Sequence, residues 1–379
     1  MVTKTKNIAA AAKKKKTRFS GIELLRIISM LGIVIYHFGD NIGVYKADFV
    51  SYPWRRSALF SGLSGFGRFG VAVFFIITGY FLCKRKSSSG GGIKSKIWPI
   101  LRVALFYWLL SIILTLIFMP DRFAPSLPLS NDMFTVRLSA IFSYDYWFIT
   151  AYILLMVLSP YLKKMLDSLT DREVTKICLI IAILSSLVMD VFRLININEA
   201  GLNNGGFPIP TPFVYALVGY TIARREKDIK RNRWAVISLL SGVFLILATP
   251  FVSAFYASQG WSSHDVFRKE LALGTMLSSI GAFIVFSRMK WQNKVVNYIA
   301  SLTLAVYLVH CNPFTFSVTL THMNRNLLRG GILGHWGFVK SGVVFLASAL
   351  GIFAACCIVE IVRRFAVRVF MRAYLVVKR

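Results

Sequence analysis

Ten apolar stretches recur along the 379-residue chain, and most are about as long as a helix that crosses a bilayer. They lie near residues 21–38, 67–83, 98–119, 144–161, 177–192, 210–223, 234–256, 271–286, 296–316 and 341–362. Several are short and need tilt or local thinning to cross a hydrocarbon layer of about 30 Å. The stretches predict an all-α integral membrane protein with about ten transmembrane helices.

Composition agrees with a membrane protein and removes the usual meaning of a strongly basic chain. The chain is 56% hydrophobic and only 16% charged, whereas about 25% of residues are charged in soluble domains. A net charge of +29 would suggest a nucleic-acid partner in a soluble protein. Here the basic residues cluster in short loops between apolar stretches, where they face anionic lipid headgroups. We expect membrane lipids as partners and no nucleic acid.

The distribution of Lys and Arg predicts the orientation of the chain. The two ends and alternate loops contain 31 of the 45 basic residues, whereas the remaining loops share 12. Because cytoplasmic loops carry the excess of basic residues, both termini should face the cytoplasm. Residues 1–18 form a Lys/Ala tract with no signal-peptide pattern. We expect a basic tail at 1–18, a membrane domain at 19–363 and a second cytoplasmic tail at 364–379.

Arg26 and His37 lie on the first apolar stretch with ten residues between them. Eleven helical steps return to within about 20° of the starting direction and rise about 16 Å. The two side chains therefore share one face, with Arg26 nearer the cytoplasm and His37 nearer the outer side. Ionisable side chains placed so in a membrane are costly and indicate a functional site.

Four short motifs occur in a definite order along the chain. Residues 19–38, FSGIELLRIISMLGIVIYHF, contain the spaced Arg and His, and residues 70–82 read GVAVFFIITGYFL. Residues 146–148 read YWF, and residues 301–310, SLTLAVYLVH, are followed by Pro313. Together these motifs resemble the acyltransferase-3 family of membrane acyltransferases, whose members commonly modify cell-envelope sugars. The resemblance covers residues 18 to 364.

One motif departs from the family pattern. The family usually places Arg, two residues and Arg before the proline that opens the third span, whereas this chain has Lys94 and Lys96 before Pro99. Lysine is a point charge without the two-pronged donor geometry of arginine. The resemblance therefore preserves the positive charge of this contact but not its geometry.

The resemblance implies an O-acyltransferase that moves an acetyl or similar acyl group from cytoplasmic acyl-coenzyme A to a glycan hydroxyl. His37 would act as the general base or as a transient acyl carrier, although a histidine near the outer interface can also be satisfied by water. Arg26 would stabilise the acyl donor or a nearby carboxylate. It can equally extend toward the inner headgroups or pair with Glu23. Glu23 is itself a candidate catalytic residue beside this structural role. Acetyl-coenzyme A is then a co-substrate, and no metal is expected.

The donor and acceptor ends are assigned to two groups of residues. Lys94, Lys96 and Arg102 would bind the phosphates of coenzyme A, and Trp98 would stack on its adenine. A positive-inside cluster with an interfacial tryptophan accounts for the same residues. At the outer side, polar and aromatic residues suited to sugar binding follow the span ends. They are Asp40, Asn41, Tyr144, Asp145, Tyr146, Trp147 and His310, and interfacial anchoring is the alternative for the aromatic ones.

The five cysteines lie in or beside apolar stretches without a CxxC motif or a spaced set of metal ligands. We interpret them as small core residues.

The alternatives to an enzyme are a lipid-linked glycan transporter or flippase and a scaffold in an envelope-assembly complex, and neither requires His37. The expected partners are a glycan or lipid-linked oligosaccharide and polysaccharide-assembly proteins, and the expected location is a bacterial cytoplasmic membrane. The sequence leaves open the acceptor and the choice between acetyl and succinyl donors.

Overall fold

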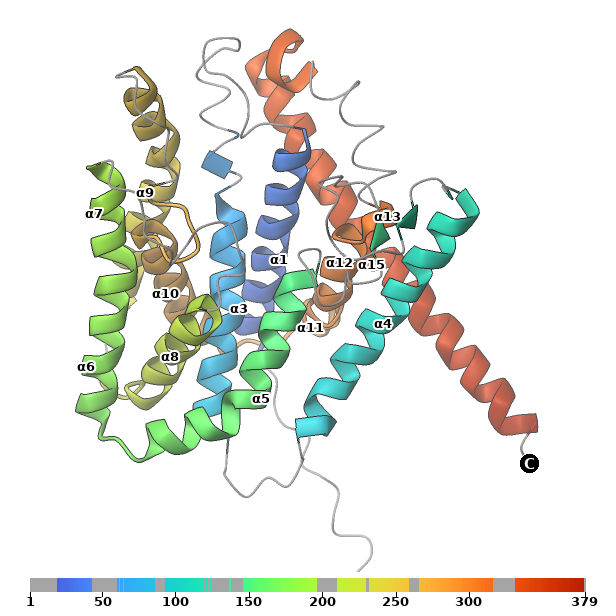
Figure 1. Ribbon diagram of the computed structural model, residues 1–379, viewed down its shortest axis with the longest axis horizontal. Coiled ribbons are helices and arrows are strands. Elements are labelled where there is room, and N and C mark those ends of the chain that lie inside the picture. Colours follow the sequence, from blue (N-terminus) through green and yellow to red (C-terminus); the bar gives the residue numbers. More distant parts are fainter. Residues whose placement is uncertain are drawn as a thin grey trace, which may run out of the picture.

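A computed structural model describes most of the chain as a bundle of helices (Figure 1). The described residues are 19–42, 60, 62–63, 65–85, 93–118, 120, 123–124, 136–137, 146–195, 210–229, 232–258, 266–315 and 331–377. The first half contains α1 (Ser20–Asn41), α3 (Phe66–Cys83), α4 (Ile93–Phe118), α5 (Trp147–Asp167), α6 (Asp171–Ala182), the π-helix η5 (Ile183–Val188) and α7 (Met189–Leu194). The second half contains α8 (Pro210–Arg224), α9 (Asn232–Ser258), α10 (Leu273–Ser287), α11 (Lys294–Ala300), α12 (Thr303–His310), α13 (Pro313–Thr315), η7 (Gly331–His335) and α15 (Phe338–Val377).

The prediction of a helical, multi-pass membrane protein is confirmed. Seven helical segments in the described part are long and apolar enough to cross a membrane: α1, α3, α4, α5, the continuous α6–η5–α7, α9 and α15. Each of the other predicted stretches corresponds to shorter helices, namely α8, α10 and the pair α11 and α12. The only strands in the described part are β1 (Phe123–Ala124) and β2 (Val136–Arg137), which pair in parallel.

Several loops predicted to face the cytoplasm meet at one end of the bundle, at the lower edge of Figure 1. Lys84, after α3, forms an ion pair of 2.6 Å with Glu226, after α8. Arg224 pairs with Asp171, which lies at the start of α6. The start of α1 contacts another loop that is predicted to face the cytoplasm. The backbone N–H of Ser20 donates a hydrogen bond to a backbone carbonyl in the loop between α10 and α11. We call this the basic end of the bundle.

Close helix packing at the centre depends on glycines. A Cβ on Gly79 of α3 would lie 1.8 Å from the carbonyl oxygen of Ala216 in α8, so only glycine allows the two backbones to approach this closely. Gly70 of α3 similarly lies against the Ser29 carbonyl of α1, where a Cβ would meet that oxygen at 2.3 Å. Small residues at helix contacts are typical of membrane bundles. The packing fixes α1 beside α3 at the centre of the bundle.

Helix α15 extends beyond the predicted span at residues 341–362 and continues through most of the predicted C-terminal tail. Its 40 residues correspond to about 60 Å, roughly twice the hydrocarbon thickness. The carboxylate of Glu360 is buried and forms bonds of 2.7 Å with Arg363 and with Arg364. Arg364 also donates to the backbone oxygen of Ser301 at 2.6 Å, which ties α15 to the turn between α11 and α12.

Candidate active site

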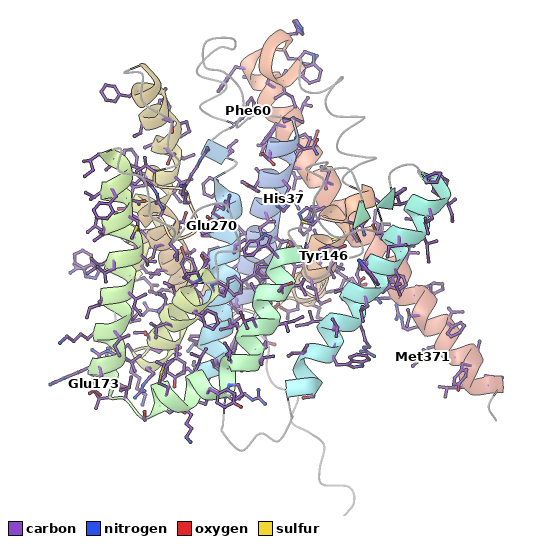
Figure 2. The ribbon with its side chains drawn as sticks, in the orientation of Figure 1. His37, Phe60, Tyr146, Glu173, Glu270 and Met371 are labelled. Carbon is purple, nitrogen blue, oxygen red and sulfur yellow. The ribbon has the colours of Figure 1, made fainter. Side chains whose placement is uncertain are left out.

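The predicted catalytic histidine lies against a second histidine. His37 is in the last part of α1, and His310 is the last residue of α12. Their Nδ1 and Nε2 atoms, respectively, are 3.0 Å apart. His310 is buried, whereas His37 remains partly exposed. Figure 2 labels His37 on α1 in the interior of the bundle. The pair therefore joins a buried imidazole on α12 to a partly exposed imidazole on α1.

The hydrogen bonds assign the protons of this pair. The Nδ1 atom of His310 is 2.5 Å from the backbone oxygen of Val306. A carbonyl oxygen only accepts hydrogen bonds, so this nitrogen carries the proton and Nε2 of the neutral ring has the lone pair. That lone pair accepts from the Nδ1–H group of His37. The Nε2 atom of His37 is then left unprotonated, which is the form that a general base requires.

Cys311 lies against both histidines. Its Sγ atom is 3.3 Å from Nδ1 of His37 and 3.4 Å from Nε2 of His310. The Cys311 side chain is partly buried. Its position beside an apolar stretch predicted a small core residue. In the structure, its sulfur lies against two imidazole nitrogens.

Two polar side chains hold the segment that contains His310. Tyr146 donates to the backbone oxygen of Leu308 at 2.9 Å. The side-chain amide of Asn312 donates to the backbone oxygen of Tyr107 at 3.0 Å and to the hydroxyl of Tyr146 at 3.3 Å. Tyr146 is completely buried, so it supports the end of α12 from within the bundle instead of presenting a surface to a sugar.

A cavity of about 280 Å³ lies between α1, α3, α4, α5 and α12. Its lining includes Arg26, Thr78, Tyr152, Ser301 and Tyr307. The ring of Tyr307 meets that of His310 edge to face, with 6.0 Å between the ring centres. The cavity therefore runs from a charged side chain on α1 to the immediate neighbour of the histidine pair. Its volume is close to the lower limit of ordinary ligand pockets.

Arg26 is the cationic side chain among the residues that line this cavity. Its guanidinium lies 3.4 Å from both carboxylate oxygens of Glu23, one turn earlier on α1. The Glu23 side chain is buried, whereas 27% of the Arg26 side chain is exposed. The predicted pairing is therefore present, and Glu23 holds the arginine while leaving part of it open to the cavity.

Comparison with known proteins identifies the family. The acyltransferase-3 family model, described as an acyltransferase domain, matches residues 19–361. The chain belongs to the acyltransferase-3 family. A search of curated proteins and a search of solved structures each found no significant match. The match includes both histidines and every residue named above that lines the cavity, so the site belongs to the acyltransferase domain.

Two of the four predicted donor residues, Trp98 and Arg102, do not line the cavity. Arg102 is exposed and Trp98 is 55% exposed, and neither lines the cavity that contains Arg26. The side chains of Lys94 and Lys96 lie outside the described part of the chain. The neighbouring Ile100 does line the cavity from α4, and Lys94 and Lys96 belong to the first turn of the same helix.

The predicted acceptor residues have different surroundings. Asp40 and Asn41 form the last turn of α1 after His37, and the side-chain oxygen of Asn41 is buried without a hydrogen-bond partner among the described residues. Trp147 begins α5 and is partly buried. Tyr144 and Asp145 lie outside the described residues. The last turn of α1 thus provides polar groups three and four residues beyond His37.

His310 was predicted to lie in the acceptor site, and its contact with His37 was not predicted. The two histidines are 273 positions apart, and no local pattern reports a contact of that separation. One signal was available: both residues lie toward the ends of apolar stretches that the charge count predicts to be on the same side of the membrane. Cys311 shares that signal, because it directly follows His310.

Proposed function

We propose that this acyltransferase moves an acetyl or similar acyl group from acyl-coenzyme A to a hydroxyl of a cell-envelope glycan, with His37 as the general base. The observation that carries the proposal is the histidine pair, in which the hydrogen bond to His310 leaves Nε2 of His37 unprotonated. The cavity beside the pair gives a place for the thioester. Its arginine stabilises the donor or the oxyanion that forms on it.

In this mechanism the acceptor hydroxyl approaches Nε2 of His37, which removes its proton while the oxygen attacks the thioester carbonyl. The new C–O bond forms as the C–S bond breaks, and the coenzyme A thiolate takes the proton back from His37. His310 holds the ring of His37 through Nδ1 while the positive charge is present on it. His310 is thus a positioning residue. It orients the base, as the third residue of a catalytic triad orients the histidine.

The geometry of α1 suits a donor that enters from the basic end. Arg26 and His37 are eleven residues apart on one continuous helix, which corresponds to about 16 Å. Coenzyme A would stay at the basic end, near the segment with Lys94 and Lys96, and extend its thioester arm along this distance. We propose that the basic end and both termini face the cytoplasm and that ten segments cross a bacterial cytoplasmic membrane. Reporter fusions that placed either terminus outside would overturn this arrangement.

Labelled acyl-coenzyme A distinguishes the enzyme from a flippase. Membranes that contain the protein should transfer label to envelope polysaccharide, whereas a flippase would move the glycan and leave it unlabelled. His37→Ala should abolish transfer while the protein remains in the membrane, and His335→Ala, which changes an exposed histidine at the end of η7, should retain it. Transfer by His37→Ala at a substantial fraction of the normal rate would contradict the assignment.

The unprotonated Nε2 of His37 is also a nucleophile, so an acyl-histidine intermediate is a second route through the same residue. The two routes differ in a half-reaction. Exchange of label between acyl-coenzyme A and free coenzyme A in the absence of acceptor requires a covalent intermediate, whereas general-base catalysis gives no exchange. The absence of exchange together with active transfer would establish the direct route.

A further inference from the structure

Three potential metal-binding atoms meet at the histidine pair. Nδ1 of His37, Nε2 of His310 and Sγ of Cys311 are separated by 3.0, 3.3 and 3.4 Å. In the described part of the chain this is the one group of three His, Cys, Asp or Glu residues close enough to hold a metal ion. The three side chains come from α1 and from the end of α12, so the contact is created by the packing of the bundle.

The separations suit a tetrahedral cation. With Zn–N bonds of about 2.0–2.1 Å and a Zn–S bond of about 2.3 Å, tetrahedral angles place two nitrogens about 3.3 Å apart and a nitrogen and sulfur about 3.6 Å apart. Each observed separation is smaller by a few tenths of an ångström or less. Small rotations of the three side chains would therefore admit the ion without a change in the helices.

The surroundings of His310 match those of a metal ligand. A metal-bound imidazole usually donates its second N–H group to a backbone carbonyl or a carboxylate, which fixes the ring. His310 makes this contact with the carbonyl of Val306 at 2.5 Å. Its Nε2 lone pair is aimed at the other two atoms of the group. Cys311 would lose its thiol proton on binding, because the thiolate is the form that binds a metal.

The donor set selects the class of cation. Two imidazole nitrogens and one thiolate favour Zn²⁺ or Cu⁺, whereas Mg²⁺ and Ca²⁺ require oxygen ligands. The group contains no carboxylate. The partial exposure of His37 provides access, and three protein ligands leave a fourth tetrahedral position for water.

We infer that His37, His310 and Cys311 bind a thiophilic cation of the Zn²⁺ type, and that the bound ion inhibits acyl transfer. Binding at Nδ1 of His37 moves the ring proton to Nε2, which removes the lone pair that the proposed mechanism uses. The inhibitory part of this inference rests on the proposed function. Binding itself does not, and it departs from the sequence-based expectation of no metal.

The test uses Co²⁺ as a spectroscopic probe on the purified full-length protein in detergent. Wild type should bind one equivalent, with the charge-transfer absorption of a thiolate–Co²⁺ bond, and Zn²⁺ should displace the Co²⁺. Cys311→Ser should lose that absorption and weaken Zn²⁺ binding by about 10-fold or more. The matched control is Cys357→Ser, which changes another partly buried free cysteine and should leave both measurements unchanged. Cys311→Ala, checked by its elution as a single species, provides a second variant.

An absent thiolate band in wild type, or a band that persists in Cys311→Ser, would overturn the site. His37→Ala and His310→Ala should each weaken Zn²⁺ binding to a similar extent, although neither needs to be active for this measurement. In the transfer assay Zn²⁺ should inhibit wild type reversibly, and a chelator should restore its rate. Binding without inhibition would preserve the site and overturn its inhibitory role, together with the assignment of Nε2 as the base.

Discussion

Replacing His310 tests whether catalysis depends on the orientation of His37 as well as on its presence. In wild type the 3.0 Å bond between the two rings fixes which nitrogen of His37 is protonated. His310→Leu removes the acceptor and leaves the Nδ1–H group of His37 with the Cys311 sulfur at 3.3 Å, which is a weak acceptor. An unsatisfied buried donor costs about 1–3 kcal/mol. We therefore expect kcat to fall by about 10- to 100-fold.

The assay is acyl transfer by purified protein at varied concentrations of acyl-coenzyme A. Because His310 does not line the cavity, KM for the donor should change little while kcat falls. His310→Gln supplies an amide oxygen as a substitute acceptor and should recover part of the lost rate, a result that a purely structural role would not produce. A kcat for His310→Leu equal to that of wild type, or no advantage of Gln over Leu, would refute the proposed role of the pair.

Three further predictions concern the helix contacts, the basic end and the cavity. Gly79→Ala should lower the stability by about 1–3 kcal/mol, because its Cβ would meet a carbonyl oxygen at 1.8 Å. Gly351→Ala, which adds a methyl group to open space within α15, should leave the thermal unfolding temperature unchanged or slightly higher. At the basic end, burial alone would raise the pKa of Glu226. Hydrogen bonds from Lys84 and Tyr80 outweigh this effect and lower the pKa. The contribution of ionised Glu226 to the stability of the fold is thus present near neutral pH and is lost as the pH falls below about 4. Glu226→Gln should remove this acid-dependent loss of stability. The loss is at most about 1 kcal/mol, because both side chains of the ion pair are exposed. Unfolding profiles of Glu226→Gln that coincide with those of wild type down to pH 3 would contradict this prediction. Finally, Arg26→Gln should raise KM for acyl-coenzyme A by about 5- to 30-fold, measured by initial rates, and an unchanged KM would exclude the arginine from donor binding.

The helices of this protein could be predicted from the sequence because their cause is local. Apolar stretches of spanning length require helices in lipid, and the spacing of Arg26 and His37 follows from the helical repeat. Both residues indeed lie on α1. The length of α15 was not predicted, because the positive-inside rule treats a basic cluster as a loop, although arginine is a good helix former.

The candidate site was only half predictable, because its second half is a long-range contact. His37 was found from its place in a motif and its position on a helix. The roles of His310 and Cys311 depend on how α12 packs against α1, which no local periodicity reports. Tyr146 shows the same limit: its aromatic motif suggested a sugar-binding surface, but its hydroxyl supports the backbone of α12 from the interior.

Transfer across a sealed membrane by the purified protein tests the proposed role of His37 most directly. Proteoliposomes would contain wild type or His37→Ala, with labelled acetyl-coenzyme A at the side of the basic end and a hydroxyl-bearing glycan at the other. Label should reach the glycan with wild type and fall to background with His37→Ala at equal protein content. Equal labelling by the two proteins, or labelling only when donor and acceptor share one side, would contradict this prediction.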